Sequence, residues 1–238
     1  MMAPAQFTLF GSQHLAVLFV LAVLAVGMAW AGRRLQGAAL AWLGRALAGL
    51  LLCYAGALYF QAFRNGWLHW GTSLPLQLCD WVLIACLVTL IRPNHLAAEI
   101  AYFWGLGGTL QAVLTPDMTQ GFPSWRFLQF FWGHGAALLG IVYIIAAQHF
   151  RPRPRSTLRM LIALNVYGVI ALGLDLAFGW NYGYLMKKPG GSSLFDYLGS
   201  WPWYLLSIEC IAAVNFWLLG LPWKLGDRIR RRHGADST

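Results

Sequence analysis

The stretch Ser73-Leu74-Pro75-Leu76-Gln77-Leu78-Cys79-Asp80-Trp81 opens an apolar segment that runs to Ile91. Proline is favoured in the first turn of a helix, because its missing N–H would have no partner there. Pro75 therefore predicts the start of a membrane helix, with Cys79 about one turn inside it. The partial positive charge of a helix N-terminus favours a thiolate. Asp80 follows directly, and an ionisable residue in an apolar segment is costly enough to indicate a function.

The composition of the chain is that of an integral membrane protein. Of its 238 residues, 59% are hydrophobic and 11% are charged, whereas a soluble domain carries about 25% charged residues. No Gly/Ser/Pro-rich linker divides the chain, so we expect one domain over residues 1–238. The net charge of +9 does not indicate nucleic-acid binding, because the basic residues lie at the ends of apolar segments. The four cysteines form no CxxC pair, so neither a disulfide framework nor a metal site is predicted.

Seven segments are apolar enough to cross a membrane, whose core of ~30 Å needs about 20 such residues. They lie near residues 13–31, 38–61, 75–91, 96–114, 125–148, 158–178 and 202–221. The sequence thus predicts an all-α fold, a polytopic membrane helix bundle with about seven transmembrane helices. Most of the 17 Lys and Arg residues fall at one set of segment ends, and the other set holds Arg64, Arg126, Lys187 and Lys188. The positive-inside rule then places the N-terminus outside and the C-terminus in the cytoplasm.

Polar residues of six segments fall at a similar depth in the membrane. Counted at 1.5 Å per residue from the basic ends, they lie about 18–24 Å from that side. They are Gln61, Cys79, Asp80, Gln111, His134, Asp175 and Glu209. Buried charges are expensive, so these side chains are expected to face one another or a wet cavity. The outer loops add Asn181, Tyr182 and Trp203 among many aromatic residues, which are either an interfacial belt or a rim that grips a lipid headgroup or glycerol backbone.

Each candidate residue also has a purely structural interpretation. Free cysteine is often a buried and inert packing residue, and a membrane histidine often only bonds a neighbouring helix. His134, however, lies between Gly133 and Gly135, which permit close approach of backbone or ligand. Histidine is also the usual base that activates a thiol. Asp80, Asp175 and Glu209 are each able to orient His134 or to form a proton path, and the sequence does not choose between these roles.

An ordered set of motifs resembles a known family. The motifs are Leu74-Pro75-Leu76-Gln77-Leu78-Cys79, Tyr102-Phe103-Trp104-Gly105, Gly108-Thr109-Leu110-Gln111-Ala112 with Thr115-Pro116, Phe131 through His134-Gly135, Asn181-Tyr182 with Tyr184-Leu185, and Trp201-Pro202-Trp203-Tyr204. With them nearly the whole chain resembles the bacterial YwaF-type integral membrane proteins, which are grouped with the transmembrane protein 164 family. This resemblance implies a location in the bacterial plasma membrane.

For the animal member, the resemblance implies a cysteine-dependent acyltransferase that remodels ether phospholipids. More distantly, the family is similar to the androgen-induced-protein hydrolases, which use a Thr and a His in the membrane. Carried over, the nucleophile falls on Cys79 and its basic partner on His134. Many relatives carry His where Gln77 stands, so a histidine role at that position does not transfer to this chain.

Three functions remain open from the sequence. The first is a lipid acyltransferase, transacylase or lipid ester hydrolase that acts on phospholipids through Cys79 and His134 near the outer face. In it Gln111 or Asn181 would hold the oxyanion, and Asp80, Asp175, Tyr182, Trp203 and Glu209 would contact the substrate. The second is a proton-coupled small-molecule transporter with a carboxylate relay, and the third is a non-catalytic lipid-binding membrane protein. Membrane lipids are the expected substrate or ligand, and no metal, cofactor or nucleic acid is expected as a partner.

Overall fold

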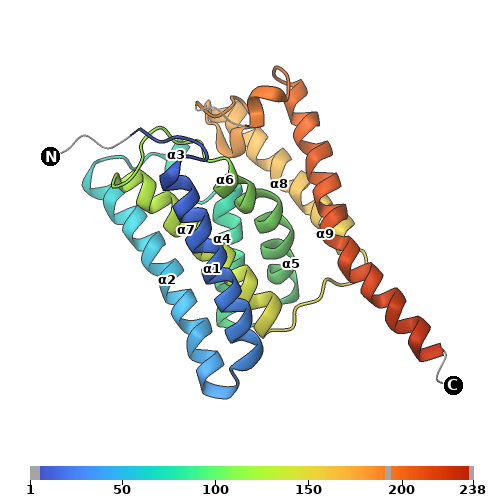
Figure 1. The fold of residues 1–238 in the computed structure, drawn as a ribbon. Coiled ribbons are helices and arrows are strands. Elements are labelled where there is room, and N and C mark those ends of the chain that lie inside the picture. Colours follow the sequence, from blue (N-terminus) through green and yellow to red (C-terminus); the bar gives the residue numbers. More distant parts are fainter. Residues whose placement is uncertain (1–5, 191–193, 236–238) are drawn as a thin grey trace.

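The computed structural model describes residues 6–190 and 194–235, and within them the chain is helical and contains no strand. Five helices are long and apolar enough to cross a membrane (Figure 1). They are α1 (Ser12–Arg34), α2 (Gly37–Arg64), α7 (Trp125–Ala147), α8 (Ser156–Phe178) and the Trp203–Asp227 part of α9 (Trp203–Ala235). The structure therefore confirms an all-α bundle of membrane helices.

The predicted count of seven spans is not supported, because five helices meet the length and hydropathy of a span. The third predicted segment forms α4 (Leu78–Ile91), whose 14 residues extend about 21 Å. The fourth divides into α5 (His95–Trp104), the π-helical turn η1 (Gly105–Thr109) and α6 (Leu110–Leu114). The reason lies in the glycines of η1, which have low helix propensity and permit the wider turn. The predicted positions of the two termini are likewise not supported by the helices themselves.

The start of α4 differs from the prediction. Pro75 does not begin the helix; Gln77 is its N-cap in extended conformation, and Cys79 is the second helical residue. The later start of the helix is due to tertiary contacts, because hydroxyl groups from parts of the chain distant in sequence hold the residues before Gln77 in an extended conformation. The Tyr167 hydroxyl donates to the Leu76 carbonyl at 2.8 Å. These residues follow the short α3 (Trp70–Ser73), and we call residues 74–77 the entry strap.

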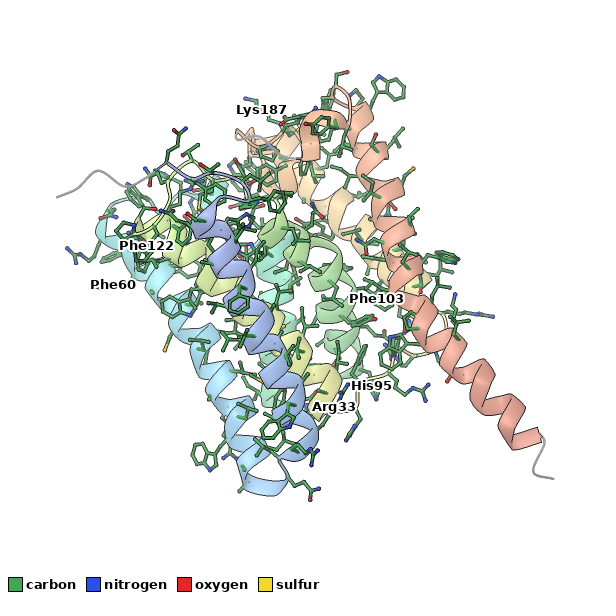
Figure 2. All side chains as sticks on the ribbon, viewed as in Figure 1. Arg33, Phe60, His95, Phe103, Phe122 and Lys187 are labelled. Atoms are coloured by element: carbon green, nitrogen blue, oxygen red, sulfur yellow. The ribbon has the colours of Figure 1, made fainter. Side chains whose placement is uncertain are left out.

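Helix α7 lies at the centre of the bundle and is the most buried of the five candidate spans. It packs against α1, α2 and α4, and the main hydrophobic core lies where these helices meet α5. Helices α8 and α9 form a pair beside α5 (Figure 1). Phe103, which Figure 2 labels, lies on the side of α5 that faces α9. Its ring packs on Phe216 of α9, with ring centroids 5.5 Å apart. The pair is thus attached to the bundle mainly through α5.

A buried carboxylate joins α5 to the start of α8. Glu99 is fully buried and accepts hydrogen bonds from Arg153 Nε at 2.9 Å and from Arg159 at 2.8 Å. The Ser156 hydroxyl also donates to it. These charge-assisted contacts satisfy both carboxylate oxygens. Glu99 therefore holds the start of α8 against the first part of α5, whose first residue, His95, is labelled in Figure 2.

Candidate functional site

A small cavity lies where α2, α4, η1 and α7 meet. Its volume is about 20 Å³, which is room for about one water molecule. It is lined by Tyr54, Cys79, Asp80, Leu83, Thr109, Gly133, His134 and Ala137. Three residues singled out from the sequence, Cys79, Asp80 and His134, therefore come together here although they lie on two helices.

The hydrogen bond of His134 defines which of its nitrogen atoms carries the proton. Nδ1 lies 2.8 Å from the carbonyl oxygen of Phe130, one turn earlier in α7. A carbonyl only accepts, so Nδ1 carries a proton, and in the neutral ring Nε2 is then the nitrogen with the lone pair. The ring also stacks on Phe130, with centroids 4.1 Å apart. His134 is thus held in the tautomer that a general base requires, with Nε2 unused by any described residue.

His14, near the start of α1, shows what a structural histidine looks like in this protein. It is fully buried, and Phe10 N–H donates to its Nδ1 at 3.1 Å. Its Nε2 lies 2.9 Å from the carbonyl oxygen of Val113. Both nitrogens are therefore committed to backbone groups, and His14 ties the start of α1 to α6.

Cys79 is placed in the first turn of α4, and Asp80 caps the same turn. The Asp80 carboxylate accepts a hydrogen bond from Gln77 N–H at 3.0 Å, which is a stabilising arrangement at a helix N-terminus. The first N–H groups of a helix have no intrahelical partner. Asp80 therefore has a structural role whatever else it does, and its own N–H donates to the Gln77 carbonyl at 3.0 Å.

The other cysteines have different surroundings. Cys86, about two turns after Cys79 on α4, is fully buried, and its thiol lies 3.6 Å from the Ala137 carbonyl oxygen. Cys53 and Cys210 are exposed on the surface of the helices. Among the described cysteines, Cys79 alone lines the cavity with a histidine.

Sequence reasoning missed Thr109. Its side chain is buried, with 2% exposed, it faces the Cys79 thiol, and its hydroxyl has no hydrogen bond of good geometry to any described residue. Thr109 ends the π-helical turn η1, and such turns occur frequently at functional sites. The available signal was the run Gly105-Leu106-Gly107-Gly108-Thr109, an unusually glycine-rich stretch inside an apolar segment.

Tyr54 was also missed. It lines the cavity from α2, its ring packs edge-on against Trp132 at 6.0 Å between centroids, and its hydroxyl pairs with Gln129. A Cβ added at Gly133 would collide with this ring. Gly133 therefore serves the packing of Tyr54 beside His134. The sequence signal was weak, because Tyr54 lies in an apolar run two turns before Gln61.

Asp175 and Tyr182 lie away from the cavity and position the entry strap. Asp175 is buried and accepts a hydrogen bond from Tyr182 N–H at 2.9 Å. The Tyr182 hydroxyl donates to the Trp70 carbonyl and accepts from Leu74 N–H at 3.0 Å. In addition, Gln77 Oε1 accepts from Gly183 N–H at 2.9 Å. The loop after α8 thus holds the residues that lead into α4 and Cys79.

Four further predicted residues lie elsewhere, and their roles toward a substrate remain predictions. Gln111 donates to the hydroxyl of Thr115, the residue that caps the end of α6, at 2.9 Å. The Asn181 amide is engaged by the backbone of Met186 and Lys187. Glu209 on α9 accepts from Asn165 of α8 at 2.7 Å, and Trp203 is 66% exposed at the start of α9. Within the described residues, no group of three or more His, Cys, Asp or Glu side chains is placed to hold a metal ion.

Of three comparisons with known proteins, the comparison with family models gave a match. Searches of curated proteins and of solved structures found no significant match. The model of the TMEM164 family matches residues 9–220, a range that contains every helix that lines the cavity. The chain therefore belongs to the TMEM164 family of membrane proteins.

Proposed function

We propose that this protein is a membrane-embedded lipid acyltransferase, or a hydrolase of lipid esters, that works through a thioester on Cys79. The observation that carries the proposal is the shared cavity of Cys79 and His134. There His134 has one nitrogen fixed by a backbone carbonyl and the other free to accept a proton. A thiol beside such a base is the arrangement of an activated nucleophile.

The proposed reaction has two steps. In the first, His134 Nε2 takes the thiol proton, and Cys79 Sγ attacks the carbonyl carbon of a lipid ester. The ester C–O bond breaks, the lipid alcohol leaves with the proton from His134, and an acyl-cysteine remains. In the second, His134 deprotonates an acceptor hydroxyl, which attacks the thioester and releases the thiol. A lipid acceptor gives transfer, and water gives hydrolysis.

Two groups beside the thiol are suited to the developing oxyanion. The N–H groups of Leu78 and Cys79 in the first turn of α4 would be fixed donors, and the Thr109 hydroxyl is a buried donor without a good partner among the described residues. A cavity of about 20 Å³ admits a carbonyl group but not a lipid. The acyl chains and the headgroup would therefore lie between the helices or at the membrane surface.

The test is mass spectrometry of the purified protein after incubation with a phospholipid that carries a labelled acyl chain. We expect acyl mass on the Cys79 peptide, removable by hydroxylamine as a thioester. Cys79→Ser should abolish turnover, and His134→Ala should slow acylation by about 10²–10⁴-fold, the usual contribution of a general base. Cys53→Ser, an exposed cysteine outside the cavity, is the matched control and should acylate normally.

Two results would reject this function. One is equal labelling of Cys53 and Cys79, and the other is full lipid remodelling by a correctly folded Cys79→Ser variant. Lipid binding without turnover, both in the unaltered protein and in the Cys79→Ser variant, would favour the non-catalytic lipid-binding alternative. Uptake of a small molecule into vesicles driven by a proton gradient would favour the transporter.

We also propose that the chain crosses a bacterial plasma membrane seven times, with its N-terminus outside and its C-terminus in the cytoplasm. In this proposal, the shorter apolar helix α4 and the continuous helical run of residues 95–114 would be two crossings beyond the five long helices. At 1.5 Å per residue, that run extends about 30 Å, close to the thickness of the core. The distribution of Lys and Arg supports this orientation.

A further inference from the structure

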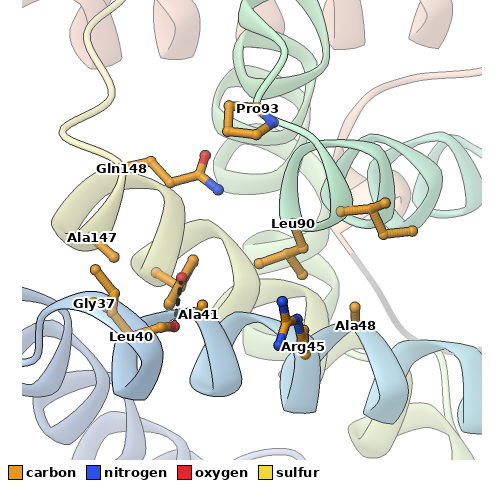
Figure 3. A pocket seen from close by; sticks show the side chains of 11 residues that line it. Gly37, Leu40, Ala41, Arg45, Ala48, Leu90, Pro93, Ala147 and Gln148 are labelled. Carbon is orange, nitrogen blue, oxygen red and sulfur yellow. Dashed lines mark hydrogen bonds between the residues drawn. The ribbon is translucent and has the colours of Figure 1, made fainter.

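A second and larger cavity opens at the other end of the contact between α2, α4 and α7. Its volume is about 450 Å³, within the range of small-molecule sites. Figure 3 shows the residues of the three helices that surround it. The buried residues Ala48, Leu90, Tyr143 and Ala147 form its floor. The exposed residue Arg45 lies at its rim, and we call this cavity the Arg45 groove.

Arg45 has no carboxylate partner among the described residues. Its guanidinium lies over the Trp42 ring, 4.9 Å from the centroid, and points from α2 toward the groove (Figure 3). By contrast, Arg153 and Arg159 share Glu99, and Arg151 pairs with Asp227. Arg45 is therefore a cation that the fold leaves free to meet an anion from outside the chain.

The polar atoms of the groove wall are largely satisfied within the protein. The Tyr143 hydroxyl donates to the Leu40 carbonyl at 2.9 Å, and Gln148 Nε2 donates to the Thr89 carbonyl at 3.0 Å. What remains for a ligand is one positive charge at the rim and apolar surface below it. A small hydrophilic anion would leave that apolar surface uncovered.

The position of Arg45 along α2 fits a lipid headgroup. Arg45 and Arg64 are 19 residues apart, so they are separated by about 28 Å, close to the thickness of the hydrocarbon core. Arg45 then lies at the level of the membrane interface, at the end of the bundle with most of the basic residues. Basic pockets between membrane helices at such a level bind anionic headgroups.

We propose that the Arg45 groove binds an anionic phospholipid, with its phosphate on Arg45 and the first part of an acyl chain on the floor. The site is separate from the Cys79 cavity. Leu51 on α2 and Cys86 on α4 are fully buried, and each lies along its helix between the residues of the Arg45 groove and those of the Cys79 cavity. The proposal therefore does not depend on the catalytic role of Cys79.

The experiment measures lipid binding to the full chain in detergent by native mass spectrometry. The probes are dioctanoyl-phosphatidylglycerol and its zwitterionic analogue dioctanoyl-phosphatidylcholine. We expect the anionic lipid to bind about five- to tenfold more tightly, as one basic residue at the interface provides. Arg45→Gln should abolish this preference. Arg64→Gln is the matched control, because Arg64 is also exposed on α2 and lies over an aromatic ring, Phe60, but lines no described groove.

A second pair of variants tests the groove without changing its charge. Ala41 lines the groove and Ala46 does not, and both are exposed on α2. Ala41→Leu should weaken binding of the anionic lipid severalfold, whereas Ala46→Leu should leave it unchanged. Equal binding of the two lipids, or equal effects of Arg45→Gln and Arg64→Gln, would overturn the proposal. Competition by glycerol 3-phosphate as strong as that of the whole lipid would also overturn it, since the site would then bind a free phosphate.

Discussion

Replacement of Gly133 by alanine tests how the Cys79 cavity is built. The added Cβ would meet the Tyr54 ring, with two of its carbons at 2.6 and 2.7 Å, whereas ordinary contacts begin at 3.4 Å. A third ring carbon lies closer still, so the ring must move by about 1 Å, although Trp132 packs against it. Overpacking of this kind costs about 1–3 kcal/mol. Alanine recovers up to about 1 kcal/mol through its higher helix propensity.

Gly135→Ala is the matched control on the other side of His134. Its Cβ would meet the Leu21 terminal methyl group at 2.7 Å, with the next atoms at 3.7 and 3.8 Å. The terminal methyl group can rotate aside, so overpacking destabilises this variant little, and alanine stabilises the helix through its higher helix propensity. The difference in unfolding free energy between the two variants should be about 1–3 kcal/mol. At about 2–4 °C per kcal/mol for a chain of this size, the melting temperature of Gly133→Ala in detergent should be about 2–12 °C below that of Gly135→Ala.

The double variant Gly133→Ala/Tyr54→Ala decides whether Tyr54 is the cause. Without the ring, the alanine at position 133 should cost nothing, so the two changes should be non-additive by about 1–3 kcal/mol. Acylation of Cys79 should fall by at least about tenfold in Gly133→Ala, because a shift of about 1 Å in a site is costly. Equal melting of Gly133→Ala and Gly135→Ala, or simple additivity in the double variant, would refute the described packing.

Two other predictions concern the end of the molecule with most of the basic residues. Glu99→Gln should lower the unfolding free energy by about 2–4 kcal/mol, because Arg153 and Arg159 lose the buried negative charge that they share. The loss stays moderate because both arginine side chains remain partly hydrated. Asp227→Asn breaks the exposed pair with Arg151 and should cost about 0–1 kcal/mol, so equal shifts in thermal unfolding would contradict this reasoning. A reporter that is active only in the cytoplasm should work when fused after Thr238, and an inactive fusion with normal expression would exclude the proposed orientation.

The positions of the long helices could be predicted because they depend on local composition. The apolar segments predicted near residues 13–31, 125–148 and 158–178 correspond to α1, α7 and α8 within about three residues. A run of apolar residues has few alternatives to a helix in a membrane, since its backbone groups must be satisfied internally. The start of α4 could not be predicted in this way. The Tyr167 and Tyr182 hydroxyl groups that hold the entry strap come from residues about 90 and 108 positions later in the sequence.

Counting residues from the ends of segments predicted depth but not direction. Cys79 and His134 share the predicted depth of about 18–24 Å, and they line one cavity. Asp175 and Glu209 share the same predicted depth, yet one bonds Tyr182 and the other bonds Asn165. Successive helical residues differ by about 100° in direction, so the face on which a residue lies depends on how the helices pack.

The π-helical turn explains why an unsatisfied hydroxyl lies beside the thiol. Gly105 brings the start of η1 against Ile141 of α7 and Val82 of α4, where a Cβ would collide with Ile141 and lie 3.1 Å from Val82. The wider turn that follows ends at Thr109, in contact with the cavity. A buried hydroxyl without a partner costs about 1–3 kcal/mol, and this cost is removed when an acceptor atom enters a space of about 20 Å³. In the proposed reaction, an ester carbonyl that accepts from Thr109 would have its carbon near the Cys79 sulfur, so one hydrogen bond would both bind the substrate and orient it for attack.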